Sequence, residues 1–254
     1  MDLGLQGARV AVTGGSRGIG RQVVSTLLAE GARVATCGRD AEALDSAVAE
    51  LAKLGEVWGA PADVTVPEQL TGWLDAATEH LGGLDVLVCN ASVQPAGEDD
   101  STWETAFQGD LMQAVRAVRH VGPLLGESDR GAVVLVSSVT ALSAATGPGQ
   151  LAYGTVKSAL LTLNAKLSRQ LGRQGVRVNA VVPGVVTFPG GVWDRLAGAA
   201  PEMVAGVAAG TSLGRLGTPA DVADVVAFLA SPRAAYITGA AVRVDGGLTD
   251  AVDT

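Results

Sequence analysis

The chain has 254 residues, 48% of them hydrophobic and 17% charged, which suits one large α/β domain or two small ones. Its net charge of −8 lacks the basic surface needed to bind nucleic acid, so none is expected as a partner. No apolar run could span a bilayer and the N-terminus has no targeting pattern, so we expect a cytoplasmic protein without a membrane partner. The two cysteines fall in predicted strands and the two histidines in helical patterns, which favours reduced thiols and no metal site.

Short valine-rich runs alternate with helical patterns along the chain. Runs of strand length lie at 9–13, 33–37, 57–60, 84–89, 132–137, 177–182 and 241–244. Helical patterns lie at about 18–30, 41–54, 67–81, 101–125, 150–173 and 219–230. Such alternation implies right-handed crossovers and a parallel sheet with helices on both faces. The sequence therefore predicts one doubly wound α/β domain over residues 1–254, with a seven-stranded parallel sheet.

The segment 187–217 carries no clear strand and is rich in Gly, Ala and Pro. A long insertion of this kind is either a functional lid or a disordered stretch. Phe188, Trp193 and Leu196 give it a strongly apolar character. We favour a lid that covers a substrate, because such large apolar side chains need something to cover.

A glycine-rich stretch, T-G-G-S-R-G-I-G, follows the first predicted strand and leads into a helix. Glycine allows a sharp turn and a close approach of the backbone, and a helix N-terminus offers free N–H groups to phosphate oxygens. The spacing differs from the standard G-x-G-x-x-G fingerprint, so a tight turn without a ligand is the alternative. Its position after the first strand favours a dinucleotide site. The residues assigned to it are Gly14, Ser16, Arg17, Gly18, Ile19 and Gly20.

The second predicted strand ends in T-C-G-R-D. Enzymes that prefer NAD usually place an acidic residue near this point, whereas an arginine accommodates the 2′-phosphate of NADP. Arg39, together with Arg17, could flank that phosphate, so we expect NADP(H) to be preferred over NAD(H). Asp40 is the alternative ligand for a ribose, or else the N-cap of the next helix.

Tyr153 and Lys157 lie four residues apart at the start of a helical pattern, and so on one helix face. A phenol titrates near ~10, and a nearby ammonium stabilises its phenolate, which brings a tyrosine toward useful acid–base chemistry. An exposed polar pair is the alternative. The helix has its own apolar stripe in Leu160, Leu163 and Leu167, so packing does not require the pair.

Seven motifs occur in register along almost the whole chain, from about Gly7 to Gly247. They are T-G-G-S-R-G-I-G, Asp63-Val64, C-N-A-S, S-S-V, Y-G-T-V-K, N-A-V-V-P-G and V-D-G-G. In order and spacing they resemble the classical short-chain dehydrogenase/reductase family. The resemblance implies a Rossmann-type domain, usually a homotetramer or homodimer, that transfers hydride between a nicotinamide cofactor and a carbonyl or alcohol.

The resemblance also implies roles for single residues. Tyr153 would be the general acid during reduction, Lys157 would bind the nicotinamide ribose, and Ser138 would hydrogen-bond the substrate oxygen. Further residues would contact the cofactor. Asp63 and Val64 would flank the adenine, Asn90 would lie beside the cofactor, and Pro183, Gly184 and Val186 would lie near the nicotinamide.

Asp110 stands where the family normally has an asparagine, which is taken to hold a water that links the lysine to solvent. It lies on a helical stripe that is otherwise apolar, with Trp103, Phe107 and Leu111. A carboxylate can only accept hydrogen bonds and would offset the charge of Lys157. We therefore expect Asp110 to act in the site by accepting from water; a surface position is the alternative.

Two other departures leave assignments open. The spacing from Ser138 to Tyr153 is slightly longer than is common in the family, so Thr140 is an alternative to Ser138, with Ser137 and Ser143 as neighbours. The threonine expected after Pro183-Gly184 is replaced by Phe188. Thr187, one place earlier, or backbone N–H groups near Val186 would have to replace its contact.

The sequence thus predicts an NADPH-dependent oxidoreductase that reduces a ketone or oxidises a secondary alcohol. Phe188, Trp193 and Leu196, with 93–96 and 141–146, would line an apolar pocket for a hydrophobic, cyclic or acyl-type substrate. One alternative keeps the fold for a non-redox dehydratase, cyclase or isomerase. The other is a non-catalytic nucleotide-sensing module.

Overall fold

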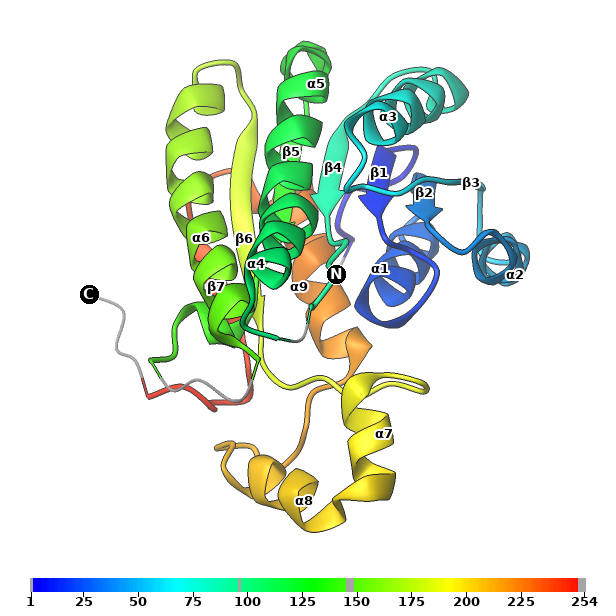
Figure 1. Ribbon diagram of the computed structural model, residues 1–254. Helices are drawn as coiled ribbons and strands as arrows, with labels where there is room; N and C mark the ends of the chain where they lie inside the picture. The colour runs from blue at the N-terminus through cyan, green and yellow to red at the C-terminus, as the bar shows by residue number, and fades with distance from the viewer. Residues whose placement is uncertain (1, 96, 145–148, 251–254) are drawn as a thin grey trace.

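The computed structural model describes residues 2–95, 97–144 and 149–250. Within these ranges, seven strands form a single sheet in the order β3-β2-β1-β4-β5-β6-β7 (Figure 1). Every neighbouring pair is parallel. The predicted single-domain, doubly wound α/β fold with a seven-stranded parallel sheet is confirmed.

The element boundaries follow the sequence patterns closely. The strands are β1 (Arg9–Thr13), β2 (Arg33–Gly38), β3 (Val57–Pro61), β4 (Val86–Cys89), β5 (Ala132–Val136), β6 (Arg177–Pro183) and β7 (Ala241–Val244). The principal helices are α1 (Gly18–Ala29), α2 (Ala41–Leu51), α3 (Pro67–Leu81), α4 (Asp100–Ala106), α5 (Gln113–Glu127), α6 (Leu151–Gly172) and α9 (Pro219–Ala230). The largest difference between a predicted and an observed strand is at β4, which begins two residues after the start of its apolar run.

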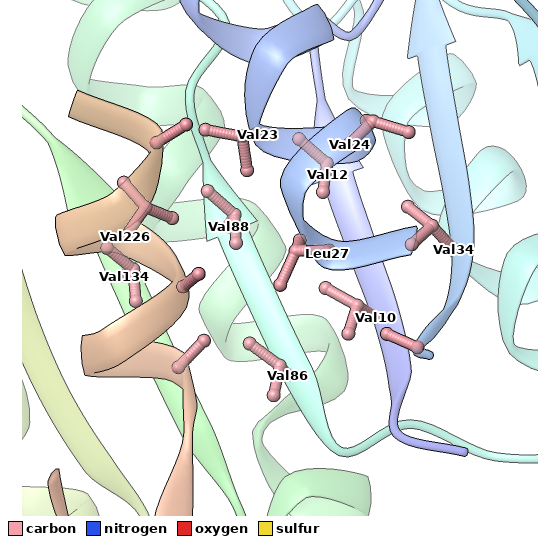
Figure 2. Packing of buried hydrophobic residues seen from close by; sticks show 14 of the residues in the cluster. Val10, Val12, Val23, Val24, Leu27, Val34, Val86, Val88, Val134 and Val226 are labelled. Carbon is pink, nitrogen blue, oxygen red and sulfur yellow. The ribbon is translucent and has the colours of Figure 1, made fainter. Parts of the chain in front are cut away.

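Two apolar cores lie on the two faces of the sheet, because alternate strand residues point to opposite sides. Along β1, Val10 and Val12 join the core beneath α1 and α9, whereas Ala11 joins the core beneath α3, α5 and α6. Figure 2 shows the first core, in which Val23 and Leu27 of α1 face the strand valines. Both faces of the sheet are therefore buried, as the continuous valine runs predicted.

The single helix expected over 101–125 is interrupted. Between α4 and α5 lies a π-helix, η1 (Phe107–Met112), a rare conformation that is frequent at functional sites. Gly109 belongs to this turn, and a Cβ atom there would lie 2.5 Å from Val93 Cγ2. The missing side chain thus lets the segment after β4 pack directly on η1.

The segment 187–217 is more regular than the sequence suggested, since it contains α7 (Val192–Ala199) and α8 (Pro201–Ala209). Neither helix has a buried residue, and both stand beyond the carboxyl ends of the strands (Figure 1). The two ends of the segment are joined by Thr187 N, which donates to Gly217 O (3.0 Å), and Leu213 N donates to Gly246 O (3.1 Å), just after β7.

Cys37 and Cys89 are free and buried, and burial raises the pKa of each thiol to about 12. This agrees with the expectation of reduced thiols. Among the described residues, no helix has the length and apolar character needed to cross a membrane.

Candidate functional site

The motif residues gather at one edge of the sheet, because the carboxyl ends of parallel strands meet there. The glycine loop follows β1, Asn90 follows β4, Ser138 follows β5, and Pro183 closes β6; these four strands are adjacent in the sheet. The first turn of α6 packs on the same edge, where a Cβ at Gly154 would lie 3.0 Å from the Thr140 carbonyl oxygen.

The glycine loop forms a cradle that has no room for side chains. Gly14 and Gly18 have φ angles of 76° and 57°, which glycine adopts at little cost. A Cβ at Gly20 would lie 2.0 Å from Gly14 O. The N-cap of α1, Arg17, makes no side-chain capping bond, so the first N–H groups of the helix are left for an external acceptor.

Asn90 holds this cradle in place. Its Nδ2 donates to the carbonyl oxygens of Thr13 and Gly14, both at 3.0 Å, and its backbone N–H donates to Thr13 Oγ1. A side chain at Gly20 would also meet Asn90 Nδ2, at 2.3 Å. Asn90 therefore links the end of β4 to the loop after β1, a supporting role that complements its predicted place beside the cofactor.

Arg17 and Arg39 are both exposed and lie at the ends of neighbouring strands. Ser16 is close to the end of β2, since a Cβ at Gly38 would lie 3.2 Å from Ser16 Oγ. The carboxylate of Asp40 accepts from Ala43 N at 3.1 Å as the N-cap of α2. Of the two alternatives for Asp40, the capping role is thus the one observed.

Asp63 and Val64 follow β3 at the same edge. Asp63 Oδ1 accepts from Thr65 N (2.9 Å) and Thr65 Oγ1 (2.7 Å), which fixes the turn that leads into α3. Val64 is 6% exposed, and its side chain packs in the second apolar core, at the carboxyl end of the sheet.

Lys157 is the largest fully buried side chain, 1% exposed. Its Nζ lies 5.5 Å from the centroid of the Tyr153 ring and donates to Val136 O at 3.1 Å. Ser137 Oγ donates to Lys157 O at 2.9 Å. The predicted Tyr–Lys pair therefore shares one face of α6, and Ser137 helps to anchor the helix to β5.

Asp110 is completely buried and pairs with this lysine. Its Oδ1 lies 3.2 Å from Lys157 Nζ and also accepts a hydrogen bond from Ser92 Oγ. Burial by itself lowers the pKa of the Lys157 ammonium, but attraction by the phenolate form of Tyr153 and by the Asp110 carboxylate outweighs it, so this pKa lies above its ordinary value. Lys157 is therefore a cation at neutral pH. Asp110 lies in the site rather than on the surface.

The hydroxyl groups after β5 interact with one another. Ser138 Oγ accepts from Thr140 N at 3.2 Å and from Thr140 Oγ1 at 3.0 Å. Both lone pairs of Ser138 are then engaged, so its own proton can be donated elsewhere.

Phe188 lies against the glycine loop. A Cβ at Gly18 would come within 2.7 Å of Phe188 Cζ, so the ring rests on the loop at the start of α1. Thr187 N donates to Gly217 O and has no spare proton for a ligand. Gly184 N likewise donates to Val244 O at 2.9 Å.

Sequence reasoning did not select Ser92 or Thr13 as site residues. Ser92 ends the C-N-A-S motif and contacts Asp110, and Thr13 Oγ1 accepts from the N–H groups of Asn90 and Ala91. A hydroxyl residue at the carboxyl end of a strand was the available signal for both. The side-chain partners could not be deduced, since they come from distant segments.

Comparison with known proteins gives a consistent result. A family model described as Enoyl-(Acyl carrier protein) reductase matches residues 14–249. Isoepoxydon dehydrogenase patN of Penicillium expansum is 36% identical over 250 residues, covering 96% of each chain. The structure of L-sorbose reductase from Gluconobacter frateurii, complexed with NADPH and L-sorbose, has a TM-score of 0.92 and 26% identity, covering 99% of this chain and 100% of that one. The chain belongs to the short-chain dehydrogenase/reductase family.

Other members act on alcohols, as their names state. The 2-(S)-hydroxypropyl-CoM dehydrogenase 3 of Xanthobacter autotrophicus is 36% identical over 247 residues, covering 94% of this chain and 96% of the relative. As a short-chain dehydrogenase/reductase, this chain is an oxidoreductase whose relatives act on alcohols and ketones. The glycine loop fits a dinucleotide, because Cβ atoms at Gly14, Gly18 and Gly20 would collide with neighbouring protein atoms, so that only glycine allows this compact turn beside the uncapped N-terminus of α1.

Replacement of Gly20 tests whether the cradle is closely packed. We expect Gly20→Ala to lower the free energy of unfolding by ~1–3 kcal/mol, because the added methyl group collides with Gly14 O and Asn90. The matched control is Gly72→Ala in α3, where nothing lies within 4 Å and where alanine should stabilise the helix by ~0.5–1 kcal/mol. Urea denaturation measures both variants. Equal changes in the two would contradict the close packing.

Proposed function

We propose that the chain is an NADPH-dependent oxidoreductase that reduces a ketone, or oxidises the corresponding secondary alcohol, with Tyr153 as general acid/base. The observation that carries this proposal is the buried Lys157 ammonium, 5.5 Å from the centroid of the Tyr153 ring. An ammonium is taken out of water only at considerable cost. A purely structural helix would have no need of it at this position.

The residues divide the work of reduction between them. Tyr153 donates its phenolic proton to the carbonyl oxygen, and Lys157 stabilises the phenolate that remains. Ser138 donates a hydrogen bond to the same oxygen, since Thr140 already fills its acceptor positions. The nicotinamide cofactor supplies the hydride when it is bound. Asn90 keeps the glycine loop in the conformation that receives the dinucleotide.

NADPH is the preferred cofactor in this proposal. Arg17 and Arg39 are exposed at the ends of adjacent strands, where guanidinium groups suit a 2′-phosphate. The carboxylate of Asp40 is engaged with the N-terminus of α2, so it competes poorly for the ribose hydroxyls of NAD.

The substrate is hydrophobic, and cyclic or acyl-type. Phe188, Trp193 and Leu196 are half-buried and lie in the segment 187–217, which acts as a lid over the substrate. The pocket also includes 93–95 and 141–144; Ala96, Ala145 and Thr146, which were expected to line it as well, lie outside the described residues.

Non-redox chemistry is a weaker candidate for this site. It would use Asp110 as an additional base, but this carboxylate is buried and held by Ser92 and Lys157. A nucleotide-sensing module would not need the buried ion pair.

Assembly as a homotetramer, or a homodimer, in the cytoplasm completes the proposal. Phe107 and Leu151 are 41% and 48% exposed, and Phe107 and Val156 line a surface groove between η1 and α6. A second copy of the chain would cover these apolar side chains.

Replacement of Tyr153 tests the proposed activity. We expect the wild-type protein to oxidise NADPH in the presence of cyclic, aromatic or acyl-type ketones. Tyr153→Phe should lower kcat by about 10²–10⁴, the usual contribution of general acid–base catalysis, with little change in the Kd for NADPH. The control is Tyr236→Phe, since this second tyrosine is fully exposed. Tight NADPH binding without turnover of any ketone would instead favour non-redox chemistry.

Replacement of Arg39 tests the cofactor preference. Arg39→Ala should raise the Kd for NADPH about tenfold, since a charge-assisted hydrogen bond contributes ~1.5 kcal/mol and ~1.4 kcal/mol corresponds to a factor of ten. The Kd for NADH should stay the same. Arg173→Ala, at an exposed position beyond α6, is the control, and fluorescence titration gives all the constants. An equal loss of affinity for both cofactors would argue against a contact with the 2′-phosphate.

Replacement of Trp193 tests the role of the lid. Trp193→Ala should raise KM for bulky hydrophobic ketones much more than for small ones, because it removes a large apolar contact surface. Val192→Ala, its exposed neighbour on α7, should change neither value. Steady-state kinetics with a matched pair of substrates measures the difference, and equal effects on both would remove Trp193 from the pocket.

A further inference from the structure

The ring of Phe188 lies between two glycines that come from different parts of the site. A Cβ atom at Gly18 would lie 2.7 Å from Phe188 Cζ and 2.9 Å from both Cε atoms. A Cβ at Gly191, the buried N-cap of α7, would lie 3.1 Å from the same Cζ. The tip of the ring thus fills the space between the glycine loop and the start of α7, and a side chain on either glycine would displace it.

A tight turn connects Phe188 to α7. Gly191 N donates to Phe188 O at 2.9 Å, which closes a four-residue turn with Pro189 and Gly190 at its centre. Gly190 has a φ of 73°, and proline followed by a residue of positive φ is the pattern of a type II turn. Since this turn leads directly into α7, a movement of α7 away from the glycine loop would pull the ring from Gly18.

The ring also meets the end of a helix that lacks acceptors. α1 begins at Gly18, and no side chain caps it. Ile19, the second residue of α1, packs with Phe188 on the same apolar core. An apolar ring restricts the access of water to the first N–H groups of the helix, but it accepts no hydrogen bond from them. A phosphate oxygen would be such an acceptor, and its attraction to the helix end is stronger where water is excluded.

We propose that Phe188 is a latch that retains the pyrophosphate of the bound dinucleotide, and that release requires Phe188 and α7 to leave the glycine loop together. The inference rests on the proposed function, since it concerns the same nicotinamide cofactor. Phe188 excludes water from the pyrophosphate, whereas Arg17 and Arg39 bind the 2′-phosphate. The latch therefore acts on NADPH and NADH alike. Within the lid, Trp193 and Leu196 are left to contact the substrate.

Removal of the ring tests the latch directly. Phe188→Ala should raise koff for NADPH about tenfold and leave kon within about twofold of wild type, because lost contacts act mainly on dissociation. The koff for NADH should rise by the same factor, in contrast to the effect of Arg39→Ala. Adenosine 2′-phosphate, which has no pyrophosphate, should keep its Kd. Stopped-flow displacement of the fluorescent cofactors gives the rate constants, and competition titration gives the Kd of the fragment.

Two glycines at α7 give a matched pair of variants that keep the ring. In Gly191→Ala the new methyl group would lie 3.1 Å from Phe188 Cζ and 3.0 Å from Phe188 O, so the ring must shift and koff should rise about threefold. In Gly198→Ala nothing lies within 4 Å of the methyl group, and koff should not change. The double variant Phe188→Ala/Gly191→Ala should release NADPH no faster than Phe188→Ala, since both changes act through one contact.

Amide hydrogen exchange measures the link to α7 without turnover. No residue of α7 is buried, so its amides should exchange readily in the free protein. Saturating NADPH should slow this exchange about tenfold in the wild type and have little effect in Phe188→Ala, because the ring no longer joins α7 to the bound cofactor. Exchange in α3 serves as the control and should be the same in both proteins. Thermal denaturation verifies that each variant is folded.

The outcomes separate the latch from the proposed function. An unchanged koff in Phe188→Ala would overturn the latch. An equal loss of affinity for NADPH and adenosine 2′-phosphate would also overturn it, since this result indicates a general distortion of the site, and so would additive effects in the double variant. Faster release of NADPH from Phe188→Ala, in a protein that turns over no ketone, would overturn the proposed function and leave the latch supported.

Discussion

A positive charge held out of water is the constraint on which this site depends. Lys157 is 1% exposed, and an ammonium in such a place is stable only if it is paired and hydrogen-bonded. Val136 O and Asp110 meet this requirement from β5 and η1. Removal of either partner would leave a charge that water cannot reach. The position of Lys157 therefore ties the start of α6, the end of β5 and the π-helix to one another, and the ring of Tyr153 lies beside the same ammonium.

The parallel sheet makes this convergence possible. Residues far apart in sequence, such as Asn90 and Thr13, meet because β1 and β4 are neighbours with their carboxyl ends at one edge. The π-helix supplies what a regular helix would not. It places Asp110 in the interior, and Gly109, which has no side chain, leaves room for the segment after β4 to pack on the π-helix. Local irregularity at this point serves the site, which agrees with the general occurrence of π-turns at functional positions.

The sequence predicted the fold well, because its dominant signals are local. Valine runs define strands, and glycines with φ angles near 60–80°, such as Gly14 and Gly18, define turns that other residues adopt only with strain. The pairing of Tyr153 with Lys157 was also predictable from helical spacing. What the sequence could not give is contact between distant segments. The hydrogen bond from Ser92 to Asp110, and the ring of Phe188 against Gly18, depend on a π-turn and on the path of the chain after β6. Neither leaves a periodic pattern.

The carboxylate at position 110 changes the local balance of donors and acceptors. An asparagine, as the family normally has here, could both donate and accept, whereas a carboxylate only accepts. Within the described part of the chain, Asp110 Oδ2 and Gln113 Oε1 are buried and have no hydrogen-bond partner among the protein groups. The compensation lies on the other oxygen, where Oδ1 holds both the ammonium of Lys157 and the hydroxyl of Ser92. Because one oxygen atom contacts both partners, the interactions of the buried Lys157 ammonium are coupled to those of the exposed Ser92 hydroxyl.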